Sequence, residues 1–563
     1  MSRVTSERRG TGGAQAPPSV VSAARFVAIC TLASRVTGLA RDMLMTQVFA
    51  ITWVYDAFNY AFLIPNLFRR LFGEGALSAA FVPTFTHALE REGRESAWRM
   101  LARTLALLTV ALSVVVILIE AIVLVGALTA TAENTALTLK LTAIMTPFML
   151  TICVVALFSS ILNCLGSFVP AALTPLLLNI GMIVGVLWSG QINADDPQRR
   201  VVIVAISVIV AGVIQILVLI PALRRRGAPL GWRWEPGDPQ VRRMLALMAP
   251  IAVGQGVLLL STFLDAQLCL LLTRAAEGSA QASFLGVAFQ YPLEPGALSA
   301  LSVAQRLYQF PLGVLGISLA VSVLPALTRQ VAREDWQSWR EQSRASFRMA
   351  VFLGLLSGAL MVALSEPIVR MLFEYRRFAA SDTARVAPVL AWYGVGMWAF
   401  CSNHIVLRMF YSLGDVRTPL RISCALVPFN LALSVGLVWV EGVREAAFAI
   451  STTVTSTISV LVSLAMLRRK RASILSEPAQ FAPFARLLVA ALGGAAGAWA
   501  SWRFVFAPLA SGIDWVIIAR GVEALCPLAL GSVVVMALAA LLGAPEPGAA
   551  LAGRWARTIR KRG

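Results

Sequence analysis

The residues Asp56–Pro83 read DAFNYAFLIPNLFRRLFGEGALSAAFVP, a stretch apolar enough to cross a bilayer that nevertheless carries four ionisable side chains. Each charge near the middle of a membrane costs roughly 2.5–3.5 kcal/mol on insertion scales, so such residues are retained where they pair or line a wet cavity. One interpretation ends a short helix here, with Arg69 and Arg70 extending to the membrane surface. The glycines that follow favour instead a kinked helix whose arginines face a polar cavity and bind an anion.

The composition of the whole chain is that of a polytopic membrane protein. Of its 563 residues, 58% are hydrophobic and 14% are charged, and the formal net charge is +19. In a soluble protein that charge would suggest nucleic-acid binding. Here the basic residues occupy short loops between apolar runs, so we expect no nucleic-acid partner. The two histidines, His87 and His404, have no carboxylates at ligand spacing, and no metal centre is expected.

Apolar runs of about 20 residues predict an all-α protein with about fourteen transmembrane helices. The expected spans are 23–49, 53–86, 100–128, 136–164, 169–190, 200–223, 243–274, 298–328, 345–365, 383–413, 418–440, 445–467, 483–506 and 516–543. No loop between them is long enough for a soluble catalytic domain. Basic residues gather in alternate loops, which by the positive-inside rule places both termini in the cytoplasm. The opposite loops hold few, among them Arg199, Arg200, Arg376 and Arg377.

Short sequence repeats six spans apart predict two six-helix lobes in the same orientation. Leu162–Ile180 (LNCLGSFVPAALTPLLLNI) resembles Tyr411–Asn430 (YSLGDVRTPLRISCALVPFN), and Ala80–Thr86 (AFVPTFT) resembles Ser322–Thr328 (SVLPALT). The last two spans have no counterpart and are expected to be appended. The predicted parts are a flexible cytoplasmic N-terminus at 1–22, lobes at 23–226 and 243–471, a cytoplasmic linker at 227–242, appended helices at 472–543 and a basic cytoplasmic tail at 544–563.

Ionisable residues inside the predicted spans are the first candidates for function. In the second span, Glu74 lies four residues after Arg70 and can neutralise it, which leaves Arg69 free. Arg35 in the first span and Arg306 in the eighth also have no obvious carboxylate nearby in the sequence. We therefore expect Arg35, Arg69 and Arg306 to face one aqueous space. The plainer interpretation is that each forms an interhelical ion pair that only locks packing.

Arginine is well suited to a diphosphate ligand. Its planar fork donates two parallel hydrogen bonds to phosphate oxygens, and it stays charged when partly desolvated. Several arginines between two lobes would therefore select a lipid or nucleotide that bears phosphates. A hydrophobic drug would not require them.

Several motifs together resemble the MurJ/MviN family, the lipid II flippase branch of the multidrug/oligosaccharidyl-lipid/polysaccharide exporter superfamily. They are SRVTGLARD (Ser34–Asp42), DAF (Asp56–Phe58), IPNLFRRLFGEGALSAAFVP (Ile64–Pro83), Leu162–Ile180, RLYQFPLGVLGISLAVSVLP (Arg306–Pro325) and FYSLGDVRTP (Phe410–Pro419). The resemblance implies a transporter, not an enzyme, that works by alternating access around a central cationic cavity. The implied cargo is lipid II, the undecaprenyl-diphosphate-linked disaccharide-pentapeptide, moved from the inner to the outer leaflet of the bacterial inner membrane during cell-wall biogenesis.

The resemblance also implies which residues act: its required arginines fall on Arg35, Arg41, Arg69 and Arg306, and its required aspartates on Asp42 and Asp56. With Asn66, Arg70 and Glu74 of the second span, these residues form the predicted substrate-binding set. Some members bind sodium through a carboxylate in the seventh span and polar groups further on, and the matching positions are Asp265, Asn403, His404 and Arg408. A second carboxylate is missing there, so Arg408 is expected to be the counter-ion of Asp265 in place of a metal. Gln305 stands where members often carry an acid beside the arginine.

No cofactor is expected, and the energy source is expected to be the membrane potential or a monovalent cation gradient. The expected partners are lipid II, the phospholipid bilayer and proteins of cell-wall synthesis or division. One alternative is a flippase for another undecaprenyl-diphosphate-linked glycan, such as an O-antigen unit. A membrane-embedded lipid-processing enzyme would need clustered Asp, Glu or His, and the loops offer only scattered single acids. A structural scaffold of the division machinery would have no reason to keep arginines in apolar spans.

Overall fold

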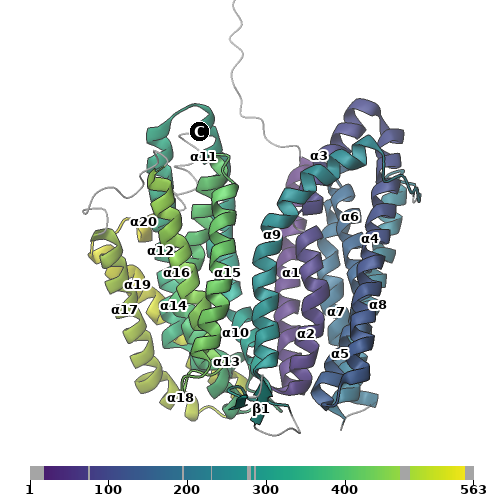
Figure 1. Ribbon diagram of the computed structural model, residues 1–563. Helices are drawn as coiled ribbons and strands as arrows, with labels where there is room; N and C mark the ends of the chain where they lie inside the picture. Colours follow the sequence, from purple (N-terminus) through teal and green to yellow (C-terminus); the bar gives the residue numbers. More distant parts are fainter. Residues whose placement is uncertain are drawn as a thin grey trace, which may run out of the picture.

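The computed structural model describes residues 18–73, 76–192, 196–229, 231–275, 281–284, 287–469 and 482–551, and it is a bundle of long helices (Figure 1). A bilayer offers no water to backbone N–H and C=O groups, so spanning segments satisfy these groups internally as helices. Residues 1–17 of the predicted N-terminus, residues 552–563 of the predicted tail, and Glu74 lie outside the described residues.

The N-terminal lobe runs from α1 to α8. Its elements are α1 (Pro18–Phe49), α2 (Trp53–Phe68), η1 (Arg69–Gly73), α3 (Ala76–His87), η2 (Ala88–Glu92), α4 (Arg94–Thr129), α5 (Glu133–Met145), α6 (Phe148–Cys164), α7 (Phe168–Ile192) and α8 (Pro197–Arg225). Helix α7 contacts both α1 and α8, and α2 contacts α5. Buried aromatic side chains such as Phe81, Phe85 and Phe148 fill its core. Within a bilayer it is this close packing that holds helices together.

The C-terminal lobe runs from α9 to α16. Its helices are α9 (Pro239–Leu271), α10 (Ala297–Pro311), η3 (Leu312–Ile317), α11 (Ser318–Ala332), α12 (Trp336–Ala363), α13 (Ser365–Phe373), α14 (Ala380–Ser412), α15 (Arg417–Leu437) and α16 (Ala446–Arg469). Helix α14 is central, because it contacts α10, α11, α12, α13 and α16. Helix α9 contacts α3 of the first lobe as well as α15 of the second, so it borders both.

The two lobes lie side by side and are closest at one end (Figure 1). The closer end is the one at which β1 and α18 lie, and we call it the hairpin end. At the other end, which we call the termini end, α1 begins and the lobes diverge. A backbone hydrogen bond joins the lobes at the hairpin end, where the N–H of Arg377 donates to the carbonyl of Gln47 at 3.4 Å.

Two of the three predicted spans that carry the candidate arginines contain a π-helical turn. Helix α2 leads into η1, which begins at Arg69, and α10 leads into η3 directly after Pro311. Proline removes a backbone donor from the helix, and π-helical turns are frequent at functional sites. The predicted interruption of the second span is therefore present.

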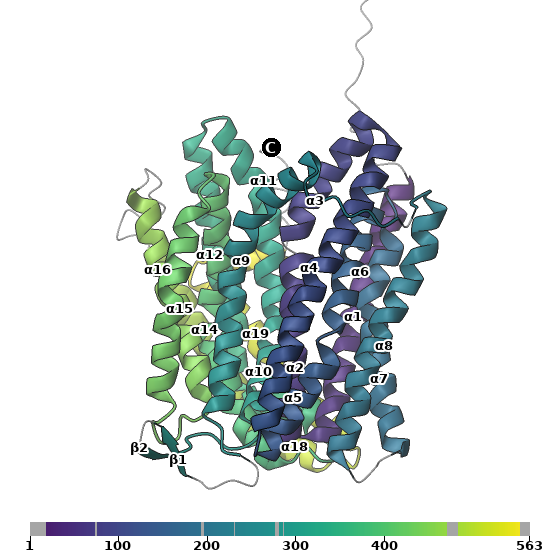
Figure 2. The ribbon, with the colours of Figure 1, turned by 45° about the vertical axis from the view of Figure 1, so that its right-hand side comes forward.

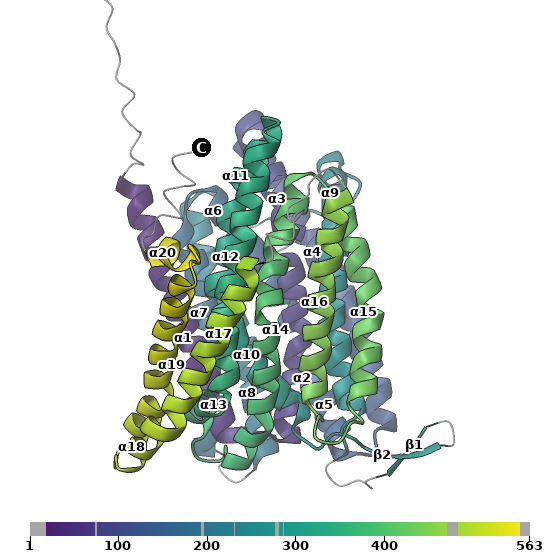
Figure 3. The ribbon, with the colours of Figure 1, turned by 90° about the vertical axis from the view of Figure 1, so that its left-hand side faces the viewer.

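The prediction of a polytopic helical membrane protein is confirmed. In the described residues, 11 helices are long and apolar enough to cross a membrane, and they match predicted spans three to nine and eleven to fourteen. Spans one, two and ten correspond to α1, to the run from α2 to η2, and to α14. These helices run along the bundle like the others (Figure 3). The total of about fourteen spans stays a prediction.

A short hairpin departs from the all-α prediction. Strands β1 (Gln281–Phe284) and β2 (Val287–Gln290) pair in antiparallel register, with Gln281 opposite Gln290 and Phe284 opposite Val287. They lie between α9 and α10, in a segment to which the sequence assigns no function. The hairpin lies at the lower left of the bundle, below α15 and α16 (Figure 2).

The last long helices pack on the C-terminal lobe. They are α17 (Ala482–Ser501), η5 (Trp502–Phe506), α18 (Ala507–Ser511), α19 (Val516–Leu541) and the short α20 (Glu546–Leu551). Helix α17 contacts α12, and α19 contacts α13. Arg370 of α13 lies 2.8 Å from both Glu523 of α19 and Glu366 of its own helix. Arg520 of α19 in turn lies 3.1 Å from Glu374. The appended helices are thus tied to α13 by ion pairs.

Replacing Glu523 by alanine is expected to cost about 1.5–3 kcal/mol of stability, because it removes the shorter of the two contacts that Arg370 makes with largely buried carboxylates and leaves only Glu374, at 3.7 Å, as a buried partner. The side chain of Glu523 is 10% exposed and also accepts a hydrogen bond from Nε1 of Trp502 at 3.1 Å. The matched control is Glu366→Ala, which removes an equally short contact to the same arginine from a side chain that is 46% exposed. Thermal unfolding in detergent should show a much larger loss for Glu523→Ala, and equal losses would contradict the prediction.

Candidate functional site

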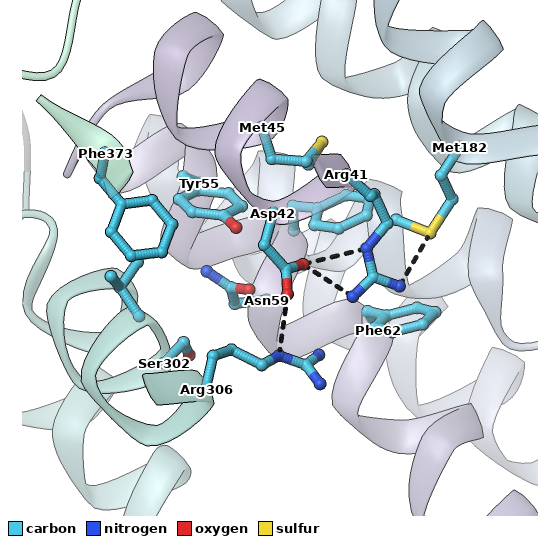
Figure 4. A pocket seen from close by; sticks show the side chains of 12 residues that line it. Arg41, Asp42, Met45, Tyr55, Asn59, Phe62, Met182, Ser302, Arg306 and Phe373 are labelled. Atoms are coloured by element: carbon cyan, nitrogen blue, oxygen red, sulfur yellow. Dashed lines mark hydrogen bonds and ion pairs between the residues drawn. The ribbon is translucent and has the colours of Figure 1, made fainter. Parts of the chain in front are cut away.

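Three charged side chains meet where the two lobes face each other (Figure 4). Arg41 and Asp42 come from α1, and Arg306 comes from α10. Arg41 donates to Oδ1 of Asp42 through Nε at 2.9 Å and Nη2 at 2.7 Å. The other oxygen, Oδ2 of Asp42, lies 3.6 Å from Nε of Arg306. A single carboxylate therefore links the two lobes through two arginines, and the cluster keeps a net positive charge.

The two arginines of this cluster are held differently. Arg41 is 7% exposed and also donates to Oδ1 of Asn179 at 3.0 Å. Asn179 is itself fixed, because its amide donates to the carbonyl of Ser34 at 2.9 Å. The side chain of Arg306 is 44% exposed, and Asp42 is its partner among the described residues. Arg41 is thus committed to the structure, whereas Arg306 is available to a ligand.

A cavity of about 360 Å³ adjoins the cluster and shares Arg306 with it. Arg70 of η1 faces the same cavity, so both lobes supply a cation. The opposite wall is built from uncharged hydroxyl and amide side chains of α14, α15 and α16. These are Asn403, Ser423, Asn430, Thr452, Thr455, Ser456 and Ser459. The cavity thus pairs cations from both lobes, suited to phosphate, with a hydrogen-bonding wall of neutral side chains that borders one carboxylate, that of Asp265 of α9.

Arg70 of η1 faces the cavity, where Arg69 was expected, and Arg69 does not line it. Arg70 is exposed and lines the cavity. The prediction that Arg69 is left without a partner is wrong, because its Nε donates to Oδ1 of Asn66 at 2.9 Å. Asn66 lines the cavity and so places Arg69 just behind its wall. The expected neutralisation of Arg70 by Glu74 lies outside the described residues.

Arg35 occupies a different position from the one expected. A side chain added to Gly313 of η3 would lie 3.3 Å from the guanidinium of Arg35, so Arg35 contacts the opposite lobe. The predicted shared cavity therefore includes Arg306, but its lining contains Arg70 in place of Arg69 and does not include Arg35. The part these residues play in substrate binding stays a prediction.

Asp56 joins the lobes at the hairpin end. It is 2% exposed, and its Oδ2 accepts a hydrogen bond from the backbone N–H of Gly296 at 2.7 Å. Its Oδ1 accepts from both the N–H and the hydroxyl of Ser299, each at 2.6 Å. A carboxylate of α2 thus caps the N-terminus of α10, where helix N–H groups lack partners and favour negative charge. Gly296 has φ +94° and would place a Cβ 2.3 Å from the carbonyl of Ile51, so glycine is required here.

Comparison with known proteins identifies the family. A family model described as "Lipid II flippase MurJ" matches residues 45–512. The chain belongs to this family. A probable lipid II flippase MurJ of Rhizobium tropici is 32% identical over 434 residues, which cover 76% of this chain and 77% of that protein. The lipid II flippase MurJ of Burkholderia cenocepacia is 30% identical over 478 residues, covering 82% and 86%.

Solved structures support the fold. Lipid II flippase MurJ in an inward closed conformation aligns with a TM-score of 0.70 at 22% identity, covering 92% of this chain and 98% of that one. An inward-facing multidrug transporter of the MATE family aligns with a TM-score of 0.62 at 13% identity, covering 78% and 95%. MurJ-family membership confirms the resemblance drawn from the motifs and the transporter architecture expected from them.

Asp265, which matches the sodium-binding carboxylate of some MurJ-family members, is hydrogen-bonded to the side-chain amide of Asn430. Oδ1 of Asp265 accepts from Nδ2 of Asn430 at 2.9 Å, and Oδ1 of Asn430 accepts from the hydroxyl of Thr455 at 3.3 Å. Among the described residues Asp265 and Arg408 form no ion pair, so that prediction is wrong. Arg408 lies instead over the ring of Tyr411, at 5.9 Å from its centroid.

Two other predicted positions of this region have different neighbours. Oδ1 of Asn403 accepts from the hydroxyl of Ser459 at 3.3 Å, and Asn403 lines the cavity. His404 is the next residue along α14. Within the described residues no group of three His, Cys, Asp or Glu side chains could hold a metal ion.

Sequence reasoning missed several residues that build the site. Asn179 holds Arg41 and Asn430 holds Asp265, so each lobe uses an asparagine to fix a charged residue. Both asparagines occur at matching places in the internal repeat, and this match could have marked them as candidate site residues. Gln305, which replaces the acid common in MurJ-family members, donates to the hydroxyl of Tyr393 at 3.2 Å.

Proposed function

We propose that this chain moves lipid II from the inner to the outer leaflet by alternating access. The observation that carries the proposal is the position of Arg306, which faces the cavity and has one 3.6 Å contact to Asp42 among the described residues. The guanidinium of such an arginine can form paired hydrogen bonds to a phosphate group at the cost of only this one long contact. Arg70 faces the same cavity from the other lobe, so one diphosphate can contact both lobes.

The neutral wall of the cavity supports a cargo with a glycan or peptide headgroup. Hydroxyl and amide side chains donate and accept hydrogen bonds, as sugar hydroxyls and peptide groups require. A purely hydrophobic drug would leave these groups unpaired, at a cost of about 1–3 kcal/mol each when buried. Another undecaprenyl-diphosphate-linked glycan would use the same wall, so an O-antigen-type cargo is the second candidate.

The cluster supports a mechanism in which cargo binding loosens the contact between lobes. Asp42 is shared between Arg41 and Arg306. A diphosphate that contacts Arg306 competes with Asp42 for the same guanidinium, so a cross-lobe ion pair weakens as the cargo binds. Arg41 remains neutralised by Asp42 and fixed by Asn179, so the binding geometry persists.

The location follows from the same proposal. A lipid II transporter works in the bacterial inner membrane, and the basic residues of the alternate loops favour cytoplasmic termini. In that orientation the termini end faces the cytoplasm and the hairpin end faces outward. Proteins of cell-wall synthesis or division would be its neighbours there.

The direct test is transport by the purified protein. Vesicles containing the full chain and fluorescent lipid II are treated with a membrane-impermeant quencher, which reports how much lipid changes leaflet. A vesicle set with an O-antigen carrier lipid provides the comparison. Faster movement of lipid II than of the O-antigen lipid supports the proposal, and movement of the O-antigen lipid alone would replace it with the second candidate.

A membrane potential alone is expected to drive the cycle. The diphosphate cargo is anionic and the empty cavity carries arginines, so an inside-negative potential favours outward movement of cargo and inward return of the empty site. A unit charge crossing the full field gains about 2.3 kcal/mol per 100 mV. If only half a charge crosses the field, the free-energy gain at 100 mV is still roughly 1 kcal/mol, which shifts a two-state equilibrium several-fold.

This prediction is checked in vesicles that hold a potassium–valinomycin potential without a sodium or proton gradient. The transport rate should rise with an inside-negative potential and fall when its sign is reversed. Rates that ignore the potential and follow a sodium gradient would show that a cation gradient drives transport.

A further inference from the structure

Three arginines at the hairpin end take no part in the mechanism above. Arg200 lies in the first turns of α8 in the N-terminal lobe, and Arg376 and Arg377 lie in the turn between α13 and α14 in the other lobe. Arg376 and Arg377 are exposed, and Arg200 is half-buried. The positive-inside rule disfavours basic residues on the outward side, so their presence at this end calls for another explanation.

Contacts with both lobes hold these arginines close together. Nε of Arg200 donates to Oγ of Ser189 at 3.4 Å, and its Nη2 lies 3.3 Å from the place a side chain on Gly190 would take. The N–H of Arg377 donates to the carbonyl of Gln47 in α1, which ties the turn to the N-terminal lobe. Arg41 of α1 contacts Met182 of α7, and Gln47 and Ser189 lie six and seven residues further along these two packed helices, so the turn that is bound to Gln47 and the Arg200 that is bound to Ser189 lie at the same level of the bundle.

The described acidic residues near this cluster are already engaged. Asp196 lies 3.1 Å from Arg199 and caps α8, and Glu374 lies 3.1 Å from Arg520. In the part of the chain that the structure describes, no carboxylate pairs with any of the three arginines of the cluster. Like charges held together repel one another. An anion placed among them would remove that repulsion.

We propose that Arg200, Arg376 and Arg377 bind a lipid-borne phosphate at the level of the outer headgroups. Guanidinium groups bind phosphate oxygens through paired, charge-assisted hydrogen bonds. Two sources carry this chemistry: an anionic phospholipid of the outer leaflet and the diphosphate of a carrier lipid. The site is separate from the central cluster of Arg41, Asp42 and Arg306, so it does not depend on lipid II being the cargo.

Hydrogen exchange of the full chain in nanodiscs tests the proposal at the site itself. Nanodiscs of phosphatidylcholine are compared with nanodiscs that also contain phosphatidylglycerol, and separately with phosphatidylcholine nanodiscs given inorganic pyrophosphate. Amides of residues 374–380 and the start of α8 should exchange about tenfold more slowly with at least one phosphate source, as expected for a 1.4 kcal/mol gain in local stability. The double variant Arg376→Gln/Arg377→Gln should lose this protection.

The matched control is Arg199→Gln, which removes the same charge one residue from Arg200 but breaks only a surface ion pair. It should keep the protection, and thermal unfolding should show that the double variant is folded. Protection by phosphatidylglycerol alone identifies a phospholipid site, and stronger protection by pyrophosphate identifies a diphosphate site. Equal exchange under all three conditions, or protection that survives in the double variant, would overturn the proposal.

Discussion

Replacing Arg306 by alanine is expected to reduce lipid II transport at least about a hundredfold. Two hydrogen bonds from a guanidinium to phosphate contribute about 1.5–3 kcal/mol each, so their loss exceeds roughly 3 kcal/mol. Arg41 cannot replace it, because Asp42 and Asn179 already hold its guanidinium. Arg306→Lys keeps the charge but loses the planar fork, so we expect an intermediate rate, reduced roughly tenfold.

The measurement is the leaflet exchange of fluorescent lipid II in vesicles with equal amounts of inserted protein. Arg329→Ala is the matched control, since Arg329 lies exposed at the end of α11 in the same lobe and does not line the cavity. It should transport within about twofold of the unchanged chain, as expected for a surface change. Normal transport by Arg306→Ala would show that Arg306 only stabilises the packing of the helices and does not bind the cargo.

Charges in apolar spans were the informative part of the sequence. Their cost in a bilayer singled out Asp42, Asp56 and Arg306, and the structure places all three at contacts between the lobes. The lobes themselves could be anticipated from the internal repeat. That repeat also contains Asn179 and Asn430, each of which fixes a charged residue of a helix far away in the chain.

The rest depended on geometry that helical periodicity does not supply. A π-helical turn begins at Arg69, and its wider spacing changes which side chain faces the cavity, so Arg70 lies there instead. The pair of Asp265 and Arg408 was predicted only because the two side chains carry opposite charges. In the structure Asp265 accepts a hydrogen bond from the neutral amide of Asn430 instead, and the sequence does not reveal which of the two side chains lies closer to Asp265.

Replacing Asp56 by asparagine is expected to open the hairpin end. The carboxylate accepts three hydrogen bonds from the start of α10, all from the opposite lobe. An asparagine can accept on one side only, and its amide would face a backbone donor on the other. The bond to Gly296 is replaced by two facing donors, and the two bonds to Ser299 lose the charge of their acceptor; together these losses amount to about 3 kcal/mol, which shifts the ratio of closed to open states roughly a hundredfold.

Ser299→Ala is the matched control, because it removes one of the three hydrogen bonds and keeps the carboxylate. It should shift the same equilibrium about tenfold or less, as expected for one bond of this kind. The readout is the distance between spin-labelled, non-canonical residues at Thr131 and Ser381, which are exposed on opposite lobes at the hairpin end. Asp56→Asn should lengthen this distance and slow transport, since the lobes must close there for the cavity to reload. An unchanged distance distribution in Asp56→Asn would show that the cap on α10 only stabilises the fold.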